Sequence, residues 1–146
     1  MIIIEGIDTL SKLVKAEVSA KNAGLVNFAA PTEVLPLSSV NVLIGDVIFV
    51  VWSAFITIGA NSGWRSIQIE KLSGTATIVY GLDLTNARFQ VFYNAGAGDP
   101  TWNGTAIFTV TADGTLTMRM VAESNVAGSS IGAGAGQLRA YVFRGR

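Results

Sequence analysis

The side chains that carry most enzyme chemistry are missing from this sequence of 146 residues, which contains no histidine and no cysteine. Their absence excludes zinc sites of the Cys/His kind, thiol catalysis, disulfide bonds and every catalytic triad with an imidazole base. A serine–lysine arrangement is also disfavoured, because no Ser-x-x-Lys motif occurs and all four lysines lie in the first half of the chain. Most hydrolase mechanisms are thereby removed.

Carboxylates are the remaining candidates for acid–base chemistry, namely Glu70, Asp83, Asp99, Asp113 and Glu123. Each of them fits a turn or the solvated face of a strand as well as it fits a catalytic pair. Only burial would shift their pKa values into a catalytic range. We therefore expect that the protein is not an enzyme and that it uses no metal and no cofactor.

Residues 126–136 form a glycine-rich run with the composition of a nucleotide-binding loop. Such a loop follows a strand and opens a helix whose N-terminus meets the phosphates. This run instead precedes a predicted strand over 137–143, and the chain has no Gly-Lys-Ser/Thr motif. We expect a flexible or tightly packed connection here.

Two tryptophans, Trp64 and Trp102, lie beside Gly or Asn in predicted loops. Because aromatic faces suit pyranose rings, the pair is a candidate glycan contact. The alternative is that both side chains seal the ends of a sandwich. The glycosylation sequon at residues 103–105 is interpreted as chance, since the sequence does not start with the pattern of a signal peptide.

Charged residues make up 14% of the sequence, whereas an ordinary soluble domain has about 25%. Hydrophobic residues make up 50%, and the ten basic and ten acidic side chains cancel. A monomer of this composition would leave much of its surface neutral and apolar, so we expect a homo-oligomer. The zero net charge argues against nucleic acids and membranes as partners.

The most apolar stretch, residues 40–60, carries a single charge at Asp46. Its length is near the roughly 20 residues that span a bilayer. Asn41, Gly45 and Asp46 interrupt it, however, and no Lys or Arg flanks it closely. We expect a bend at residues 44–46 that leads into a strand over 47–58.

That predicted strand is apolar on both faces. Ile48, Val50, Trp52, Ala54, Ile56 and Ile58 alternate on one face, and Val47, Phe49, Val51 and Phe55 lie on the other. A strand that is apolar on both faces must be covered on both. The second set is predicted to form an oligomer interface, and the alternative is cover by the chain's own N-terminal segment.

After residue 40, short alternating segments separated by turn residues predict an antiparallel all-β sandwich or barrel. The predicted strands are residues 47–58, 64–71, 75–80, 87–93, 105–111, 115–122 and 137–143. A hairpin with the loop 112–114 is expected to join two of them. In that register Ala106, Phe108 and Val110 align with Leu116, Met118 and Met120.

The last predicted strand, residues 137–143, is expected to be central in its sheet, because strands near a chain end stay ordered only when they are paired. Leu138, Ala140 and Val142 are predicted to fill the core. Tyr141 and Phe143 fall on the other face, where their large contact area suits an oligomer interface.

The N-terminal part of the chain differs in pattern. Ile7, Leu10, Leu13, Val14 and Val18 recur at helical spacing, which predicts a short amphipathic helix within residues 7–24, with an extended conformation as the alternative. Residues 29–39 contain Pro31 and Pro36 and are expected to be an irregular link.

An apolar start, with Ile2, Ile3 and Ile4, precedes this segment. These isoleucines, together with Leu10 and Leu13, are predicted to dock on another subunit or on a particle surface. The alternative is that they dock on the chain's own sandwich.

Three segments resemble small jelly-roll modules of the C1q/TNF-like type, which recur as trimeric virion proteins of tailed bacteriophages. They are residues 44–48, which open the long apolar strand, residues 108–118, and the ending 137–143 after the glycine-rich run. The resemblance covers about residues 40–146. It implies a jelly-roll β-sandwich, a homotrimer and a structural role, and it brings no catalytic residues with it.

These observations together predict an N-terminal arm, residues 1–30, followed by a jelly-roll domain, residues 31–146. The expected function is that of a trimeric capsid decoration or cement subunit, located in the virion and bound to the major capsid protein or another virion protein. The alternative is a receptor- or glycan-binding head of a phage fibre or tail.

Overall fold

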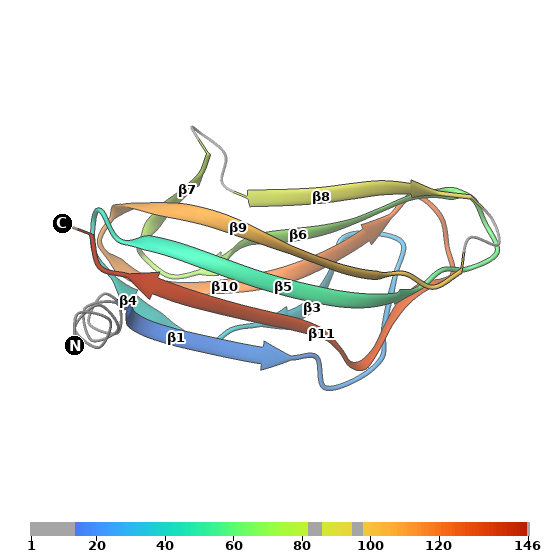
Figure 1. The fold of residues 1–146 in the computed structure, drawn as a ribbon, viewed down its shortest axis with the longest axis horizontal. Coiled ribbons are helices and arrows are strands. Elements are labelled where there is room, and N and C mark those ends of the chain that lie inside the picture. The colour runs from blue at the N-terminus through green and yellow to red at the C-terminus, as the bar shows by residue number, and fades with distance from the viewer. Residues whose placement is uncertain (1–13, 82–85, 95–97, 146) are drawn as a thin grey trace, which may run out of the picture.

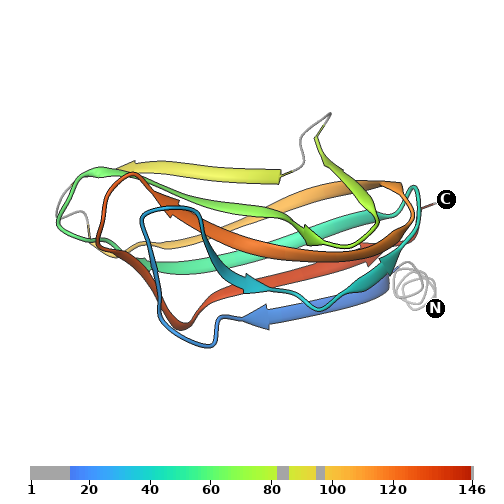
Figure 2. The same ribbon diagram turned by 180° about the vertical axis from the view of Figure 1, so that it is seen from behind.

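A computed structural model describes residues 14–81, 86–94 and 98–145. These residues form two antiparallel sheets that pack face to face, as Figures 1 and 2 show from opposite sides. The strands are β1 (Val14–Lys21), β2 (Val26–Phe28), β3 (Thr32–Pro36), β4 (Val40–Val42), β5 (Val47–Thr57), β6 (Gly63–Ser73), β7 (Thr77–Tyr80), β8 (Asn86–Tyr93), β9 (Thr101–Ala112), β10 (Gly114–Ser124) and β11 (Ser129–Phe143).

The strand order is that of a jelly roll. The first sheet, sheet A, has the order β1-β11-β5-β9-β7, and β2 also pairs with β11. The second, sheet B, has the order β3-β10-β6-β8, and β4 also pairs with β10. Successive strands repeatedly cross from one sheet to the other, which is the pattern of two interlocked Greek keys. The expected all-β jelly-roll sandwich is therefore confirmed.

The core lies between the sheets and follows from the alternation of side chains along each strand. On β5, the inward residues from Ile48 to Ile56 are at most 2% exposed. They face Ile67 and Ile69 of β6 and Met120 of β10, which are fully buried. The predicted two faces of β5 are therefore confirmed.

Within the described ranges, no helix is long and apolar enough to cross a membrane.

The predicted central position of the last strand is confirmed as well. β11 lies between β1 and β5 and pairs with both (Figure 1). Leu138, Ala140 and Val142 point into the core and are at most 2% exposed, while Tyr141 and Phe143 lie on the opposite face.

The predicted hairpin at residues 112–114 is wrong. β9 belongs to sheet A, where it pairs with β5 and β7, whereas β10 belongs to sheet B, where it pairs with β3, β4 and β6. The same apolar residues are buried as predicted, but Phe108 and Met118 belong to the core from opposite sheets and do not share a ladder. The chain at Gly114 crosses between the two sheets.

The N-terminal segment is extended where the structure describes it. Residues 14–21 form β1, which pairs with β11 from Val14↔Phe143 to Lys21↔Gln137, so the predicted helix is wrong for these residues. The antiparallel ladder with β11 supplies hydrogen-bond partners for the backbone of β1. The alternation of side chains along the strand places Ala16, Val18 and Ala20 against the core. The predicted docking residues, Ile2 to Leu13, lie outside the described residues.

Two segments that were expected to be irregular also pair. The link with Pro31 and Pro36 contains β3, an edge strand of sheet B, where a proline that lacks an amide hydrogen is tolerated. Much of the glycine-rich run belongs to β11, which bulges between Ile131 and Gly136.

The buried side chain of Asn22 holds this bulge. Its amide nitrogen donates hydrogen bonds to the carbonyls of Gly24 and Gly132 (2.8 Å each), and its oxygen accepts one from the amide of Gly136 (2.7 Å). The glycine run is therefore a tightly packed part of a strand, fixed by a residue that precedes it by more than half the chain.

Candidate interaction face on sheet A

The outer face of sheet A carries an apolar patch of seven side chains. They come from three adjacent strands and comprise Val47, Phe49, Val51 and Phe55 of β5, Ile107 of β9, and Tyr141 and Phe143 of β11. The Phe49 and Tyr141 rings stack with their centroids 6.5 Å apart. Ile107 is 54% exposed and Phe55 44%, so large hydrophobic groups lie at the surface. The polar row of Gln137, Ser53 and Asn103 separates Phe55 from the other six residues.

This patch gathers all six residues predicted for an oligomer interface. Cross-strand register explains why, since Tyr141 pairs with Phe49 and Phe49 pairs with Ile107 on one side of the sheet. Ile107 also belongs to the patch but was not among the residues predicted from the sequence. It could have been found because it is the one large apolar side chain among the threonines that share its face of β9.

The outer face of sheet B carries a network of ion pairs next to the exposed side chains of Phe92 and Leu72. Arg119 of β10 contacts Glu70 of β6 (2.6 Å) and Glu33 of β3 (3.3 Å), and Arg88 of β8 contacts Glu123 of β10 (2.8 Å). The hydrogen bond to Glu70 is the main reason why the pKa of Arg119 lies above its ordinary value. The outer face of sheet B therefore carries more charge than the apolar patch of sheet A.

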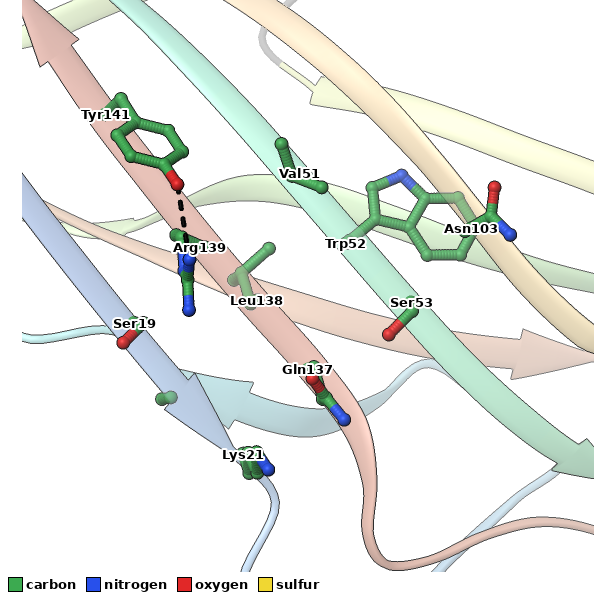
Figure 3. Close-up of a pocket in the computed structure, with 11 residues that line it drawn as sticks. Ser19, Lys21, Val51, Trp52, Ser53, Asn103, Gln137, Leu138, Arg139 and Tyr141 are labelled. Atoms are coloured by element: carbon green, nitrogen blue, oxygen red, sulfur yellow. Dashed lines mark hydrogen bonds between the residues drawn. The ribbon is translucent and has the colours of Figure 1, made fainter.

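A trough of about 590 Å³, lined by both apolar and polar side chains, lies next to the apolar patch on the same face of sheet A (Figure 3). Hydroxyl, amide and cationic side chains line it, among them Ser19, Lys21, Ser53, Asn103, Gln137 and Arg139. Arg139 donates a hydrogen bond to the Tyr141 hydroxyl (3.3 Å), at the border with the patch, and forms an ion pair with Glu17 (3.5 Å).

The trough offers hydrogen bonds and positive charge. Its cations are Lys21 and Arg139, and no carboxylate is among the described residues that line it. Such a surface suits polar contacts at the rim of a protein interface.

The candidate catalytic carboxylates are dispersed. Glu70 and Glu123 are engaged in the ion pairs of sheet B, and Asp99 and Asp113 accept hydrogen bonds from the amides of Ile58 and Ile44. Asp83 lies outside the described residues. Within residues 14–81, 86–94 and 98–145, no three His, Cys, Asp or Glu side chains are grouped as a metal site would require.

Asp46 is the most buried carboxylate of the described chain, with 2% of its side chain exposed. Its Oδ2 atom accepts hydrogen bonds from Lys15 Nζ (3.0 Å) and the Leu43 amide (2.9 Å), and its Oδ1 atom accepts one from the Gly145 amide (3.0 Å). Burial alone would raise the pKa of Asp46, but these hydrogen bonds together hold it below the ordinary value. Its oxygens are engaged in holding the fold together.

Arg65 is fully buried and has no carboxylate partner among the described residues. Its guanidinium donates to the Ser129 hydroxyl (2.9 Å) and to the carbonyls of Gly63 (2.9 Å) and Asn61 (3.0 Å). Burial lowers the pKa of Arg65, and Tyr93 acts in the opposite direction. The side chain ties the start of β11 to the loop between β5 and β6.

The two tryptophans proposed as a glycan platform lie on different surfaces. Trp64 pairs with the exposed Phe92, on the outer face of sheet B. Trp102 pairs with the buried Ala54, on the inner side of sheet A, where it stacks on Tyr93 and donates a hydrogen bond to the hydroxyl of that residue. Trp102 thus closes one end of the sandwich, and the structure does not bring the two rings together.

No protein-family model matches this sequence, and no curated protein sequence matches it. Several solved structures align over most of the chain at low identity. The VP2 subviral particle of infectious bursal disease virus aligns with 89% of the chain at 8% identity and a TM-score of 0.45. The chain spans about a third (34%) of the length of that protein.

Two smaller proteins align over nearly their whole length. Eiger TNF from S. frugiperda aligns with 89% of the chain and over 93% of its own, at 10% identity and a TM-score of 0.44. The P-domain of Macrobrachium rosenbergii nodavirus aligns with 89% of the chain and over 94% of its own, at 12% identity and a TM-score of 0.28. The assignment of this chain to the jelly-roll fold rests on its strand order.

Proposed function

We propose that this protein is a structural subunit of a virion that associates with copies of itself, as a trimer, through the apolar patch of sheet A. In this role it decorates or cements a capsid and binds the major capsid protein or another virion protein. Its partners are proteins, and its activity is assembly.

One observation carries the self-association. The outer face of sheet A exposes Val51 and Ile107 beside the stacked rings of Phe49 and Tyr141. Contiguous apolar surface of this kind in a soluble domain marks an interaction site. Three ion pairs lie on the outer face of the other sheet, whereas the Arg139–Glu17 pair of sheet A lies at the border of the apolar patch, as polar groups do at the rim of an interface.

The virion location is supported by the resemblance of residues 44–48, 108–118 and 137–143 to trimeric jelly-roll proteins of tailed phages. The strand order is the one that this resemblance implies. The role of Ile2, Ile3, Ile4, Leu10 and Leu13 in docking to the particle is part of the proposal. They directly precede β1, an edge strand of sheet A.

Native mass spectrometry tests the self-association. The expected species has about three times the 15.3 kDa of one chain. Ile107→Asp should dissociate it, because a charge in the centre of an apolar contact is left without a partner. Leu72→Asp is the matched control, since Leu72 is an exposed apolar residue of sheet B. A wild-type monomer, or equal behaviour of the two variants, would contradict the proposal.

Electron microscopy of purified particles tests the virion role. Particles with the protein should show jelly-roll density on the capsid surface, and particles without it should lack that density and break at lower temperature. A chain from which residues 1–13 are removed keeps all described strands and is expected to form trimers that no longer attach. Attachment of this shortened chain at wild-type occupancy would overturn the docking role of the segment.

A further inference from the structure

Two aromatic side chains are neighbours on the outer face of sheet B. Trp64 of β6 pairs directly with Phe92 of β8, and the Phe92 side chain is 63% exposed. Arg65, the next residue along β6, points into the core and is fully buried, which confirms that Trp64 points outward. The two rings therefore form a small aromatic surface at the β8 edge of the sheet.

Fixed polar groups border this surface. The guanidinium carbon of Arg88 lies 5.3 Å from the centre of the Trp64 ring. Arg88 is held there by Glu123, whose Oε2 atom accepts a hydrogen bond from it (2.8 Å) and another from Gln68 (3.3 Å). Donors and acceptors beside the rings are thus positioned before any ligand arrives, which lowers the entropic cost of binding.

A buried hydroxyl without a partner lies in the same place. Ser66 follows Trp64 on the outward side of β6, between Gln90 of β8 and Glu123 of β10. Its side chain is fully buried, and its oxygen makes no hydrogen bond within the described chain. Such a group costs free energy unless something bonds to it, and native proteins keep few of them.

Aromatic faces next to hydrogen-bonding groups are complementary to a sugar. The C–H groups on one face of a pyranose ring pack on an aromatic ring, while its hydroxyls need donors and acceptors at the edge. The carboxylates of Glu70 and Glu123 on this face disfavour a polyanion such as nucleic acid. Ion pairs lie beside the two rings, whereas the centre of a protein interface is depleted of charged residues.

We propose that the outer face of sheet B holds a saccharide-binding site, in which a pyranose ring stacks on the exposed Phe92 beside Trp64, whose ring is covered by the Arg88 guanidinium. Its hydroxyls bond to Arg88 and Gln90 and, once the side chains that bury it shift, to Ser66. The site does not include Trp102, and it is separate from the apolar patch of sheet A. It goes beyond the structural role proposed above and does not depend on it.

A glycan array of neutral and acidic oligosaccharides, probed with the labelled full-length protein, tests this site. Binding to at least one pyranoside class is expected. For the best ligand, Phe92→Ala should weaken binding about tenfold, through loss of the stacked ring. Ser66→Ala should weaken it about fivefold while the melting temperature stays the same or rises, because the alanine removes a hydroxyl that lacks a partner.

Leu25→Ala is the control, because Leu25 is an exposed apolar residue (64%) that belongs neither to the apolar patch of sheet A nor to the outer face of sheet B. It should leave both glycan binding and the native mass unchanged. The proposal is overturned if no oligosaccharide of the array is retained. It is also overturned if Phe92→Ala and Ser66→Ala, both folded, bind like the wild type. Loss of trimers with intact glycan binding would count against the structural proposal alone.

Discussion

The carboxylate of Asp46 accepts a hydrogen bond from the backbone amide of Gly145, 3.0 Å away, just beyond the end of β11. The other oxygen of the same carboxylate holds Lys15 of β1 and the turn at Leu43. A single buried side chain therefore connects β1 and the end of β11 to the turn that precedes β5.

Asp46→Ala should lower the free energy of unfolding by about 3 kcal/mol, because two amides and an ammonium group lose their acceptor in a buried site. Urea unfolding at neutral pH measures the change. Asp99→Ala is the control, since the exposed Asp99 accepts one hydrogen bond, from Ile58, and its loss should cost about 1 kcal/mol or less. Equal losses of unfolding free energy in the two variants would mean that the hydrogen bonds of Asp46 do not stabilise the fold more than that of Asp99.

Acid should weaken the same connection. The pKa of Asp46 in the folded protein lies below the ordinary aspartate value of 3.8, so the unfolded chain binds the proton more readily. The stabilisation is therefore complete above that value and is lost as the pH falls through the lowered folded-state pKa. The difference in unfolding free energy between the wild type and Asp46→Asn should be constant near neutral pH and shrink in acid. A difference that grows in acid would contradict the assignment.

The two faces of β11 predict different outcomes for adjacent substitutions. Val142→Asp should unfold the subunit, with a loss of about 4 kcal/mol or more, because Val142 is fully buried in the core. Tyr141→Asp should leave a folded monomer, because Tyr141 lies in the apolar patch of the outer face. Circular dichroism and native mass distinguish the two. A trimeric Tyr141→Asp variant would remove Tyr141 from the interface.

Gly114 should tolerate no side chain. A Cβ atom at this position would lie 2.2 Å from the Thr75 hydroxyl and 2.6 Å from the Ala76 amide nitrogen. Gly114→Ala is expected to cost about 2 kcal/mol or more in unfolding free energy. Gly24→Ala, where nothing lies within 4 Å of the added carbon, should change it by no more than about 0.5 kcal/mol. A wild-type melting temperature for Gly114→Ala would exclude the close approach.

Alternation along single strands predicted the core of this protein well. The inward sets of β5 and β11 follow directly from the two-residue period, since each side chain must point to one face or the other. The six predicted interface residues lie together for the same reason. Trp64 and Trp102 show the limit, because their loop-like neighbours in sequence do not indicate that Trp64 points outward from sheet B while Trp102 packs against the core.

The pairing of strands was less accessible from the sequence. Phe108 and Met118 would be buried whether their strands pair in one sheet or face each other across the core, and only the jelly-roll connection decides between these arrangements. Val14 and Val18 fit a helix and a strand equally well. The partner strand β11, far along the chain, selects the strand by providing a ladder of hydrogen bonds.

The position of β11 between β1 and β5 also sets an order of events on the ribosome. β1 and β5 are synthesised early, but the strand that joins them emerges only after β6 to β10 have been made. Until then the nascent chain exposes one edge of β5, a strand that is apolar on both faces, and such segments readily capture other chains. Sheet A is therefore completed only late in synthesis. A cell that makes this protein quickly has to prevent the exposed β5 segments of nascent chains on neighbouring ribosomes from pairing with one another.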